Sequence, residues 1–172
     1  MQPGPHKKSK IIIDILRRNN IAAIINICSG GLVKIEGLES PHIHFVSTIP
    51  YDWVFPKVYA VIHHGGSGTT HMALKSGCAS LIIPHIADQF FWNNTLYKMG
   101  VGPLGTQIGR FTTKNIEAKV VDLLKTISYK NTALKISVLM NSEDFDESLY
   151  QSLIESPNNN NDSPLLYCKP GD

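Results

Sequence analysis

Short apolar runs alternate along the chain with longer amphipathic stretches, as strands and helices do in α/β proteins. Apolar residues at helical spacing occur over positions 11–16, and a continuous, largely apolar run covers positions 21–28. A short run of this kind is typical of a strand that is buried on both faces, as in a parallel sheet covered by helices. By the same pattern we expect further strands at residues 42–46, 59–62 and 80–83.

Helices are predicted between and after these strands, from apolar stripes and from residues that begin and end helices. Asp88 is the expected N-cap of a helix that follows it, and Gly77 and Gly100 are the expected stops of two helices. The predicted helices cover residues 11–16, 69–76, 89–99 and 116–127, the last begun by Thr112 and Thr113, with weaker amphipathic stretches at 131–140 and 144–154.

This alternation predicts an α/β fold with a Rossmann-like parallel sheet and helices on both of its faces. In open sheets of this class, ligands bind beyond the carboxyl ends of the strands. Four loops leave those ends, at residues 29–31, 47–55, 63–68 and 84–88. Functional residues are therefore to be sought in these four loops.

Composition and charge narrow the class of protein. The 172 residues correspond to one domain, which we place at residues 1–155. Residues 156–172, which include a run of asparagines, are expected to form a disordered tail. The net charge of +2 is too small for a dedicated nucleic-acid binder or for a polybasic membrane binder.

The cysteines and the N-terminus bear on location. Three cysteines lie far apart, which is typical of a reduced, intracellular protein. The N-terminus is polar, and Asp14 interrupts the apolar stretch after it, so no secretory signal is predicted. No apolar run approaches the ~18 residues of a membrane span. We therefore expect a cytoplasmic location, with peripheral attachment to membranes left open.

The loop after residue 62, with the sequence HHGGSGTT, carries the most information about function. Its glycines permit a tight turn and a close backbone approach, and the N–H groups at the start of the next helix suit an anion. Ser67, Thr69 and Thr70 add hydroxyl groups, and a histidine can donate a further hydrogen bond to phosphate. The sequence is neither a P-loop nor a GxGxxG motif. We therefore expect a nucleoside diphosphate at this loop.

This loop has three other interpretations: a structural turn, a hydrolase oxyanion turn and a zinc site. A glycine-rich turn that merely caps a helix is a structural alternative. An oxyanion turn of a hydrolase is excluded, because GxSxG occurs nowhere in the chain. A zinc site built from His63, His64, His71 and His85 is disfavoured, because these spacings match no closed ligand set. We therefore predict no metal site.

A second cluster, Asp88 and Gln89, follows the strand that Pro84 ends. Capping of a helix explains Asp88 but leaves Gln89 unexplained. A carboxylate next to an amide at the same sheet edge as a phosphate loop could instead hold the vicinal hydroxyls of a hexose. The aromatic residues 90–92 that follow are expected to pack in the core.

A third cluster is the aromatic-rich segment at residues 49–56, with the sequence IPYDWVFP. We expect a loop here in which Tyr51 and Trp53 either stack on a nucleobase or pack against the protein. Phe55 is expected to be a hydrophobic plug beneath the sheet.

Taken in order, these clusters resemble the C-terminal half of the nucleotide-sugar glycosyltransferases with the two-domain GT-B fold, and most of all the sterol 3-beta-glucosyltransferases. The resemblance covers roughly residues 10–145. The segments that carry it are IPYDWVFP at 49–56, AVIHHGGSGTT at 60–70, LKSGC at 74–78, IP at 83–84, DQFFW at 88–92 and GVGP at 100–103.

The resemblance implies a role for each matching residue. His63 matches the histidine that contacts the donor pyrophosphate, and Asp88 and Gln89 match the pair that binds the sugar hydroxyls. Residues 49–53 match the uracil loop, although Tyr51 stands where these relatives usually carry a histidine. Gly65, Ser67, Gly68 and Thr69 match the phosphate loop. The donor implied is UDP-glucose, used as a substrate without a metal or other cofactor.

The resemblance also shows what this chain does not contain. The family has an N-terminal domain that binds the lipid acceptor and supplies the general base, and nothing in these residues matches it. The first strand of the C-terminal domain is also expected to be missing. We therefore assign no catalytic base.

Three functions follow from this comparison. The first is the donor-binding part of a sterol-type glucosyltransferase, inactive alone, that transfers a hexosyl group to a lipid hydroxyl. The second is a non-catalytic nucleotide-sugar-binding subunit that needs a separate acceptor-binding partner protein. The third is a degenerate fragment that binds nothing.

Overall fold

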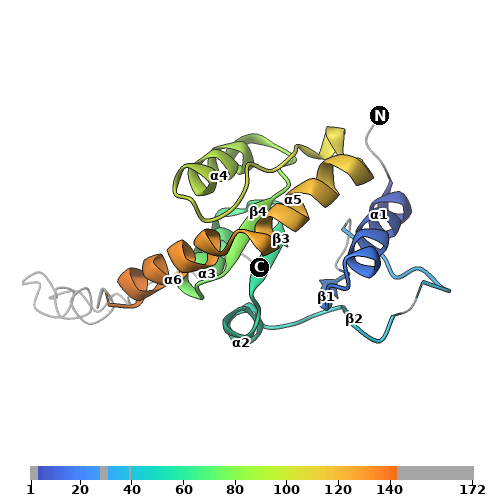
Figure 1. Cartoon of the computed structure of the whole chain (residues 1–172), viewed down its shortest axis with the longest axis horizontal. Helices are drawn as coiled ribbons and strands as arrows, with labels where there is room; N and C mark the ends of the chain where they lie inside the picture. The colour runs from blue at the N-terminus through green and yellow to red at the C-terminus, as the bar shows by residue number, and fades with distance from the viewer. Residues whose placement is uncertain (1–3, 28–30, 39, 143–172) are drawn as a thin grey trace, which may run out of the picture. The chain divides into compact units, whose positions relative to one another are not determined.

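The computed structural model describes residues 4–27, 31–38 and 40–142. Residues 1–140 form one compact unit, and the fold below is that of this unit. Its elements follow one another as α1 (Pro5–Arg18), β1 (Ala23–Asn26), β2 (Ile43–Val46), α2 (Tyr51–Val54), the 3₁₀ helix η1 (Phe55–Lys57), β3 (Ala60–His63), α3 (Ser67–Lys75), β4 (Ala79–Ile82), α4 (Ala87–Lys98), the 3₁₀ helix η2 (Ile108–Arg110), α5 (Thr113–Lys125) and α6 (Ile127–Ser142) (Figure 1).

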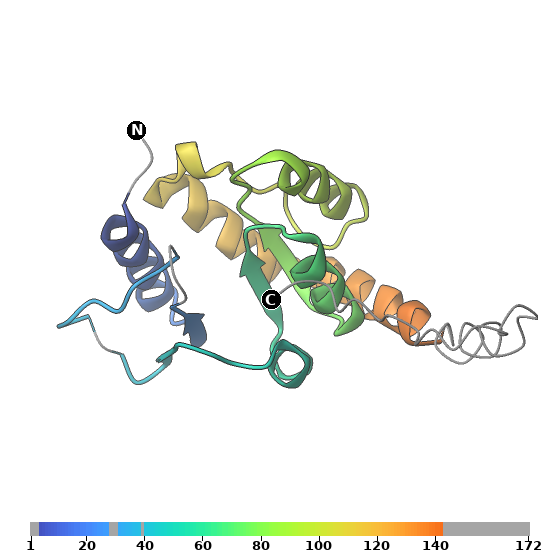
Figure 2. The ribbon, with the colours of Figure 1, turned by 180° about the vertical axis from the view of Figure 1, so that it is seen from behind.

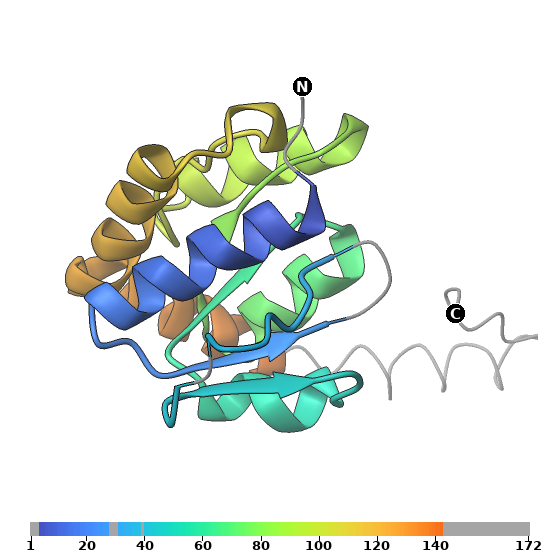
Figure 3. The same ribbon diagram turned by 90° about the vertical axis from the view of Figure 1, so that its right-hand side faces the viewer.

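The strands pair in parallel, as the sequence predicts, but the described residues form two sheets of two strands. β1 pairs with β2, with Ala23 opposite Ile43. β3 pairs with β4, with His63 opposite Ile82, and α3 makes the crossover between them. Figure 3 shows the two pairs, with α1 running across them. The α/β class and the parallel pairing are therefore confirmed, while a single continuous sheet is not formed.

One large core joins the two sheets through helices. Ile13 and Ile15 of α1 are fully buried in it, together with Ile116 of α5 and Leu81 of β4. Arg18 at the end of α1 donates a 2.9 Å hydrogen bond to the carboxylate of Glu117 on α5. The two helices therefore hold both strand pairs against one apolar layer.

Helices cover both faces of β4. Leu81 faces the core that α5 completes, whereas Ile82 packs in a second core with Leu74 of α3 and Leu96 of α4. α5 lies in front of β4 in Figure 1 and behind it in Figure 2, where α3 is on the near side. This arrangement confirms the expectation of helices on both faces for β4, whose four residues are all buried.

The segment after α4, residues 101–105, packs its backbone against the edge of β4 that does not pair with β3. The N–H of Ser80 donates a 3.1 Å hydrogen bond to the carbonyl of Val101. A Cβ atom on Gly102 would overlap the carbonyl oxygen of Ser80, and one on Gly105 would overlap that of Ile82. Glycine is required at both positions because backbone meets backbone there.

Several local predictions are confirmed. Thr112 is the N-cap of α5, and its hydroxyl accepts a hydrogen bond from the N–H of Asn115. Gly77 and Gly100 lie just after α3 and α4 with φ of +68° and +69°, the left-handed conformation in which helices commonly end. Phe55 is buried, as expected for a plug.

Other local predictions are wrong. The segment at 49–56 is not a loop, because residues 51–57 form the helical turns α2 and η1, in which Tyr51 stacks on Phe55 at 4.7 Å. The strands are not fully buried, since Ile24 of β1 is 44% exposed and Ile62 of β3 is 38% exposed. The predicted stretch 144–154, the tail 156–172 and most of the loop 29–31 lie outside the described residues. Within the part of the chain that the structure describes, no helix combines the length and the apolar character needed to cross a bilayer.

Candidate functional site

The glycine loop (residues 63–68) joins the end of β3 to the start of α3, and Gly65 determines its path. Gly65 has a φ of +95°, an angle that residues other than glycine rarely adopt. A Cβ atom there would lie 2.7 Å from Cγ2 of Ile82 and 3.3 Å from the carbonyl oxygen of Gln89. The loop therefore lies directly against β4 and the first turn of α4.

His63 is the last residue of β3 and lies beneath this loop. Its Nδ1 atom accepts a 3.2 Å hydrogen bond from the N–H of Gly65. Burial, reinforced by the neighbouring His64, lowers the pKa of His63 from 6.5 to about 4, so the ring is neutral at pH 7. Because Nδ1 is the acceptor, the ring proton is on Nε2.

The Nε2 atom of His63 is the unusual part of this arrangement. It is buried and has no hydrogen-bond partner in the structure. A buried donor left without an acceptor costs on the order of 1–3 kcal/mol, so such groups are rare unless a ligand satisfies them. The end of β3 thus holds one preformed N–H donor without an acceptor.

The start of α3 offers further donors. Gly66 is its N-cap, no side chain caps its first turn, and that turn contains no acidic residue. Ser67 and Gly68 are exposed and Thr69 is half-buried. The N–H groups of an uncapped first turn favour an anion. Thr70, by contrast, is fully buried, and its hydroxyl donates to the carbonyl of Gly66 at 2.8 Å.

The roles of Asp88 and Gln89 in the helix start are the reverse of those predicted. α4 begins at Ala87 with Ile86 as its N-cap, so Asp88 is not the cap but an exposed residue of the first turn. Gln89 is buried, and its Oε1 accepts hydrogen bonds from the N–H groups of His85 at 2.7 Å and Ile86 at 3.2 Å. An amide three residues after the N-cap reaches back to its N–H, as in a capping box. Capping therefore accounts for the oxygen of Gln89, whereas Asp88 is exposed to solvent.

The aromatic side chains after Gln89 do not fill the core as expected. Phe91 is 63% exposed and Phe90 is 37% exposed. Trp92 is half-buried against the α3–α4 core and meets His71 edge-on at 5.1 Å. Three consecutive residues of a helix point in directions about 100° apart, so they cannot share one buried face.

The structure brings the glycine loop and the Asp88–Gln89 segment together, because β3 and β4 are paired. The N–H of Ile83 donates to the carbonyl of His63 at 2.8 Å. The rings of His64 and His85 lie 6.5 Å apart. Two of the four predicted loops therefore lie side by side at the carboxyl edge of β3 and β4.

Tyr51 and Trp53 have other neighbours. The hydroxyl of Tyr51 accepts a 3.3 Å hydrogen bond from the side-chain amide of Asn26, at the end of β1. Trp53 is 56% exposed, and the ammonium of Lys57 lies 4.1 Å from the centre of its ring. Among the described residues, no hydrogen bond or ring contact joins either of them to the glycine loop.

Sequence reasoning missed two features of this region. Asn93 is buried in α4 and clamps Gly105, donating to its carbonyl at 3.2 Å and accepting from its N–H at 2.9 Å. Lys8 of α1 is only 7% exposed. Burial of His85, and then the charge of Lys8, lower the pKa of His85. An amide in an apolar helix and a lysine far away in sequence give no local signal of such partners.

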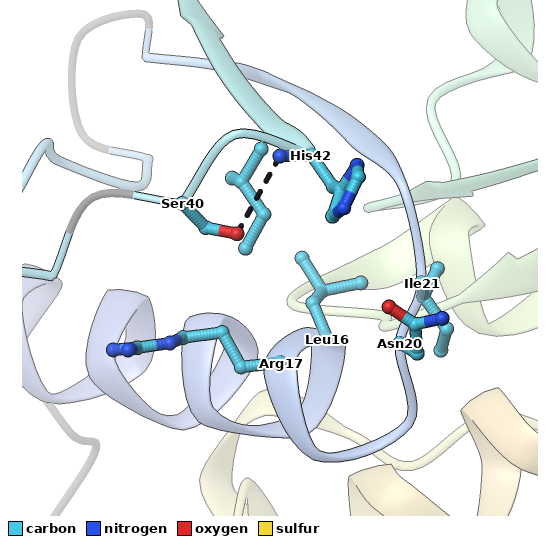
Figure 4. A pocket seen from close by; sticks show the side chains of 7 residues that line it. Leu16, Arg17, Asn20, Ile21, Ser40 and His42 are labelled. Carbon is cyan, nitrogen blue, oxygen red and sulfur yellow. Dashed lines mark hydrogen bonds between the residues drawn. The ribbon is translucent and has the colours of Figure 1, made fainter.

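The described part of the chain contains no group of three or more potential metal ligands. That the protein uses no metal stays a prediction. A small pocket lies between the end of α1 and the residues that precede β1 and β2 (Figure 4). Its position at the amino ends of the strands is opposite to the edge that carries the glycine loop. Its lining residues are Leu16, Arg17, Asn20, Ile21, Ser40, His42 and Ile43.

Comparisons with known proteins agree with this geometry. A family model described as "Erythromycin biosynthesis protein CIII-like, C-terminal domain" matches residues 18–155. Two sterol 3-beta-glucosyltransferases of Arabidopsis thaliana, UGT80B1 and UGT80A2, are 31% and 33% identical over 140 residues, which is 81% of this chain. That stretch is only 23% and 22% of their own length, so the chain corresponds to about a fifth of these curated relatives.

Solved structures share the fold at low identity. The spinosyn rhamnosyltransferase SpnG has a TM-score of 0.71 at 18% identity, over 86% of this chain and 40% of its own. The glycosyltransferase VinC, solved in complex with DTDP, has a TM-score of 0.69 at 18% identity, over 84% of this chain and 36% of its own. The fold is thus that of the C-terminal half of GT-B glycosyltransferases.

Proposed function

Because the chain belongs to the family of erythromycin biosynthesis protein CIII-like C-terminal domains, a family of glycosyltransferases, we propose that it binds a UDP-sugar at the carboxyl edge of β3 and β4. The observation that carries this proposal is the buried Nε2–H of His63, a hydrogen-bond donor without an acceptor. A phosphate oxygen of the donor would satisfy it, and the uncapped first turn of α3 would bind the same diphosphate.

Each remaining contact has a chemical basis. Ser67 and Gly68 would present exposed N–H groups to the diphosphate, with Thr69 beside them. The carboxylate of Asp88, exposed in the first turn of α4, would accept hydrogen bonds from vicinal sugar hydroxyls. Gln89 has used its oxygen for capping, so it would contribute its amide N–H₂ to the sugar.

The reaction we infer is transfer of a hexosyl group, glucose by analogy with the sterol 3-beta-glucosyltransferases, to a sterol or other lipid hydroxyl. His63 and the α3 amides would stabilise the negative charge that develops on the departing diphosphate. No residue of the described chain is assigned as the base, so we propose that transfer requires an acceptor-binding domain or partner. A cytoplasmic location, with peripheral membrane attachment as the alternative, is part of this proposal and is testable by cell fractionation.

Calorimetric titration of the whole chain with UDP and UDP-glucose tests this proposal. We expect binding that His63→Ala abolishes and that chelation of metal ions with EDTA leaves unchanged. His42→Ala is the matched control, because His42 is exposed and lies at the opposite edge of the strands. Absence of binding by the folded wild-type chain would refute the proposal.

A second candidate function, a binding subunit for a separate acceptor protein, is favoured by exposed apolar side chains at the start of α4. Ile86 is 64% exposed and Phe91 is 63% exposed. A partner protein that packs against these two side chains would remove their apolar surface from water. A stoichiometric complex that Phe91→Ser disrupts, with UDP binding unchanged, would support this function, whereas no complex with an acceptor-binding protein would exclude it.

A further inference from the structure

Two strands of the fold each have one backbone edge that no described strand pairs with, and the first of them is β1. In a parallel pair, alternate residues of a strand direct their N–H and C=O groups to opposite sides. The N–H groups of Ala23 and Ile27 donate hydrogen bonds to carbonyls on the side of β2, at 2.9 and 2.8 Å. Ile24 and Asn26, which alternate with them, therefore direct their backbone groups away from β2.

β3 has the second unpaired edge. The carbonyls of Tyr59 and His63 accept hydrogen bonds from N–H groups of β4 and of the residue after it. Ala60 and Ile62 alternate with these acceptors, so their backbone groups point away from β4. The far edge of β4 is already covered by residues 101–105. We call the outward backbone groups on the two strands the open edges, namely those of Ile24, Asn26, Ala60 and Ile62.

Among the described residues, none forms a β-bridge to the open edges. β1 lies on the side of its own pair nearer to β3 (Figure 3), and both pairs pack against the core that contains Ile13 of α1. Residues 31–38 follow β1 and pack partly against the same core, yet they pair with neither strand. An unpaired edge is a template on which another chain can form backbone hydrogen bonds.

Apolar side chains flank the open edges on both faces of the layer. Ile62 lies opposite the core-facing Leu81 in the register, so it is on the core face, yet it is exposed. Ile24 alternates with the core-facing Ile25, so it is exposed on the other face. A strand between the open edges would cover both isoleucines only with apolar residues on both of its own faces, as buried parallel strands have.

Asn26 adds a polar requirement at one end. Its Nδ2 donates a 3.3 Å hydrogen bond to the hydroxyl of Tyr51, whereas its Oδ1 is buried without a partner. Buried acceptors are rarely left unpaired. Because Asn26 is the last residue of β1, a donor near the carboxyl end of a parallel neighbouring strand would satisfy this oxygen.

We propose that a strand from a partner protein inserts between β1 and β3, parallel to both, and joins the two pairs into one sheet. The partner segment is extended, apolar on both faces and ends in a residue with a hydrogen-bond donor. Addition of a strand to an exposed edge is a common mode of peptide recognition, and here one strand satisfies two edges at once. This inference is independent of the proposed function, because it requires no nucleotide.

A synthetic peptide tests the inference on the full chain. Its core has about six consecutive valine and isoleucine residues followed by asparagine, with lysines at both ends for solubility. We expect it to slow amide hydrogen exchange at the open edges by about tenfold or more, because hydrogen-bonded N–H groups exchange only by local opening. A control peptide that alternates valine with serine should not, since one of its faces is polar. Absence of binding of the apolar peptide by the folded chain would overturn the inference.

Backbone N-methylation of the peptide distinguishes insertion from addition to one edge. A central strand is paired on both sides, so methylation of either the odd-numbered or the even-numbered core residues should abolish binding. Tolerance of either set would overturn insertion. A paramagnetic label at the carboxyl end of the peptide should broaden the resonances of His63 more than those of Ala60. The reverse pattern would overturn the parallel direction.

Ile62→Pro removes an N–H from the open edge of β3 and none from its ladder with β4, so the chain should stay folded. Peptide binding should weaken by about tenfold, the loss of one hydrogen bond. Ile62→Val is the matched control, because it keeps both the N–H and an apolar side chain. Undiminished binding by a folded Ile62→Pro chain would overturn the inference, and the methylated peptides test it without altering the protein.

The free chain tests the other occupants. Slow exchange at the open edges in dilute chain without peptide would show that the chain itself already pairs with them, which would overturn the inference. Protection that appears only with concentration-dependent dimerisation would identify a second copy as the occupant and overturn the assignment to a partner.

Discussion

The N–H of Gly65 donates a hydrogen bond to Nδ1 of His63 across 3.2 Å. This contact leaves the ring proton on Nε2, which is buried without an acceptor. Since Gly65 adopts a φ of +95°, the same residue that shapes the loop also sets the tautomer of the histidine. A replacement at Gly65 would therefore disturb both the backbone path and the direction of the histidine donor.

His63 should make stability depend on pH. Its pKa is about 4 in the folded chain against 6.5 when unperturbed, so between these values the unfolded state binds more protons. The contribution of His63 to the free energy of unfolding is therefore retained above pH 6.5, falls as the pH drops from 6.5 toward 4, by up to roughly 3 kcal/mol, and levels off below pH 4. Urea unfolding at several pH values measures this slope, and His63→Gln should reduce it. An identical slope in that variant would contradict the assignment.

Gln89→Leu should destabilise the chain by about 1–3 kcal/mol, because the N–H groups of His85 and Ile86 lose their acceptor. Gln89→Glu keeps an acceptor at the start of α4 and should cost less. Thermal unfolding measures both, with Gln107→Leu at an exposed position as the control. Equal stability of Gln89→Leu and the wild type would show that the capping contact contributes nothing.

Gly68→Ala should separate folding from binding. No atom lies within 4 Å of the position its Cβ would take, so alanine should stabilise α3 by about 0.5–1 kcal/mol. The added methyl group would stand where we propose the diphosphate approaches, and UDP affinity should fall by about tenfold or more. Melting temperature and calorimetry on the same sample give both values. A stabilised variant that keeps full UDP affinity would show that the diphosphate does not bind at this turn.

Gly102→Ala should destabilise the chain by more than about 2 kcal/mol, because its Cβ would overlap the backbone of Ser80. The two segments cannot separate without breaking the hydrogen bond from Ser80 to Val101. Gly109→Ala is the control, since the nearest atom to its Cβ would be at 3.5 Å. Denaturant titration of both variants should show a lower free energy of unfolding for Gly102→Ala and an unchanged one for Gly109→Ala.

Sequence patterns predicted those features that depend on neighbouring residues alone. Thr112 caps α5 because its hydroxyl needs only an N–H three residues later. Gly77 and Gly100 end their helices because only the backbone of the glycine itself decides the turn. The order of strands and helices follows from the same local periodicity.

Features that depend on where a helix begins, or on which way its residues face, were predicted incorrectly. Asp88 has the right side chain for a cap, but α4 begins one residue before it, at Ala87, so Asp88 lies inside the first turn. The aromatic run at 90–92 is apolar, yet the direction of each residue around α4 leaves Phe91 outside. The burial of Lys8 could not be predicted, because it arises only when α1 packs against the rest of the fold.

The division of the strands into two pairs has a mechanical consequence. Backbone hydrogen bonds make each pair stiff, whereas the two pairs are joined through the side chains of the core packed beneath α1 and α5. Packing contacts are short in range and have no fixed direction, so bending is easiest between the pairs. The glycine loop and the first turn of α4 both belong to the β3–β4 pair. The molecule can therefore flex without changing the distances within the site.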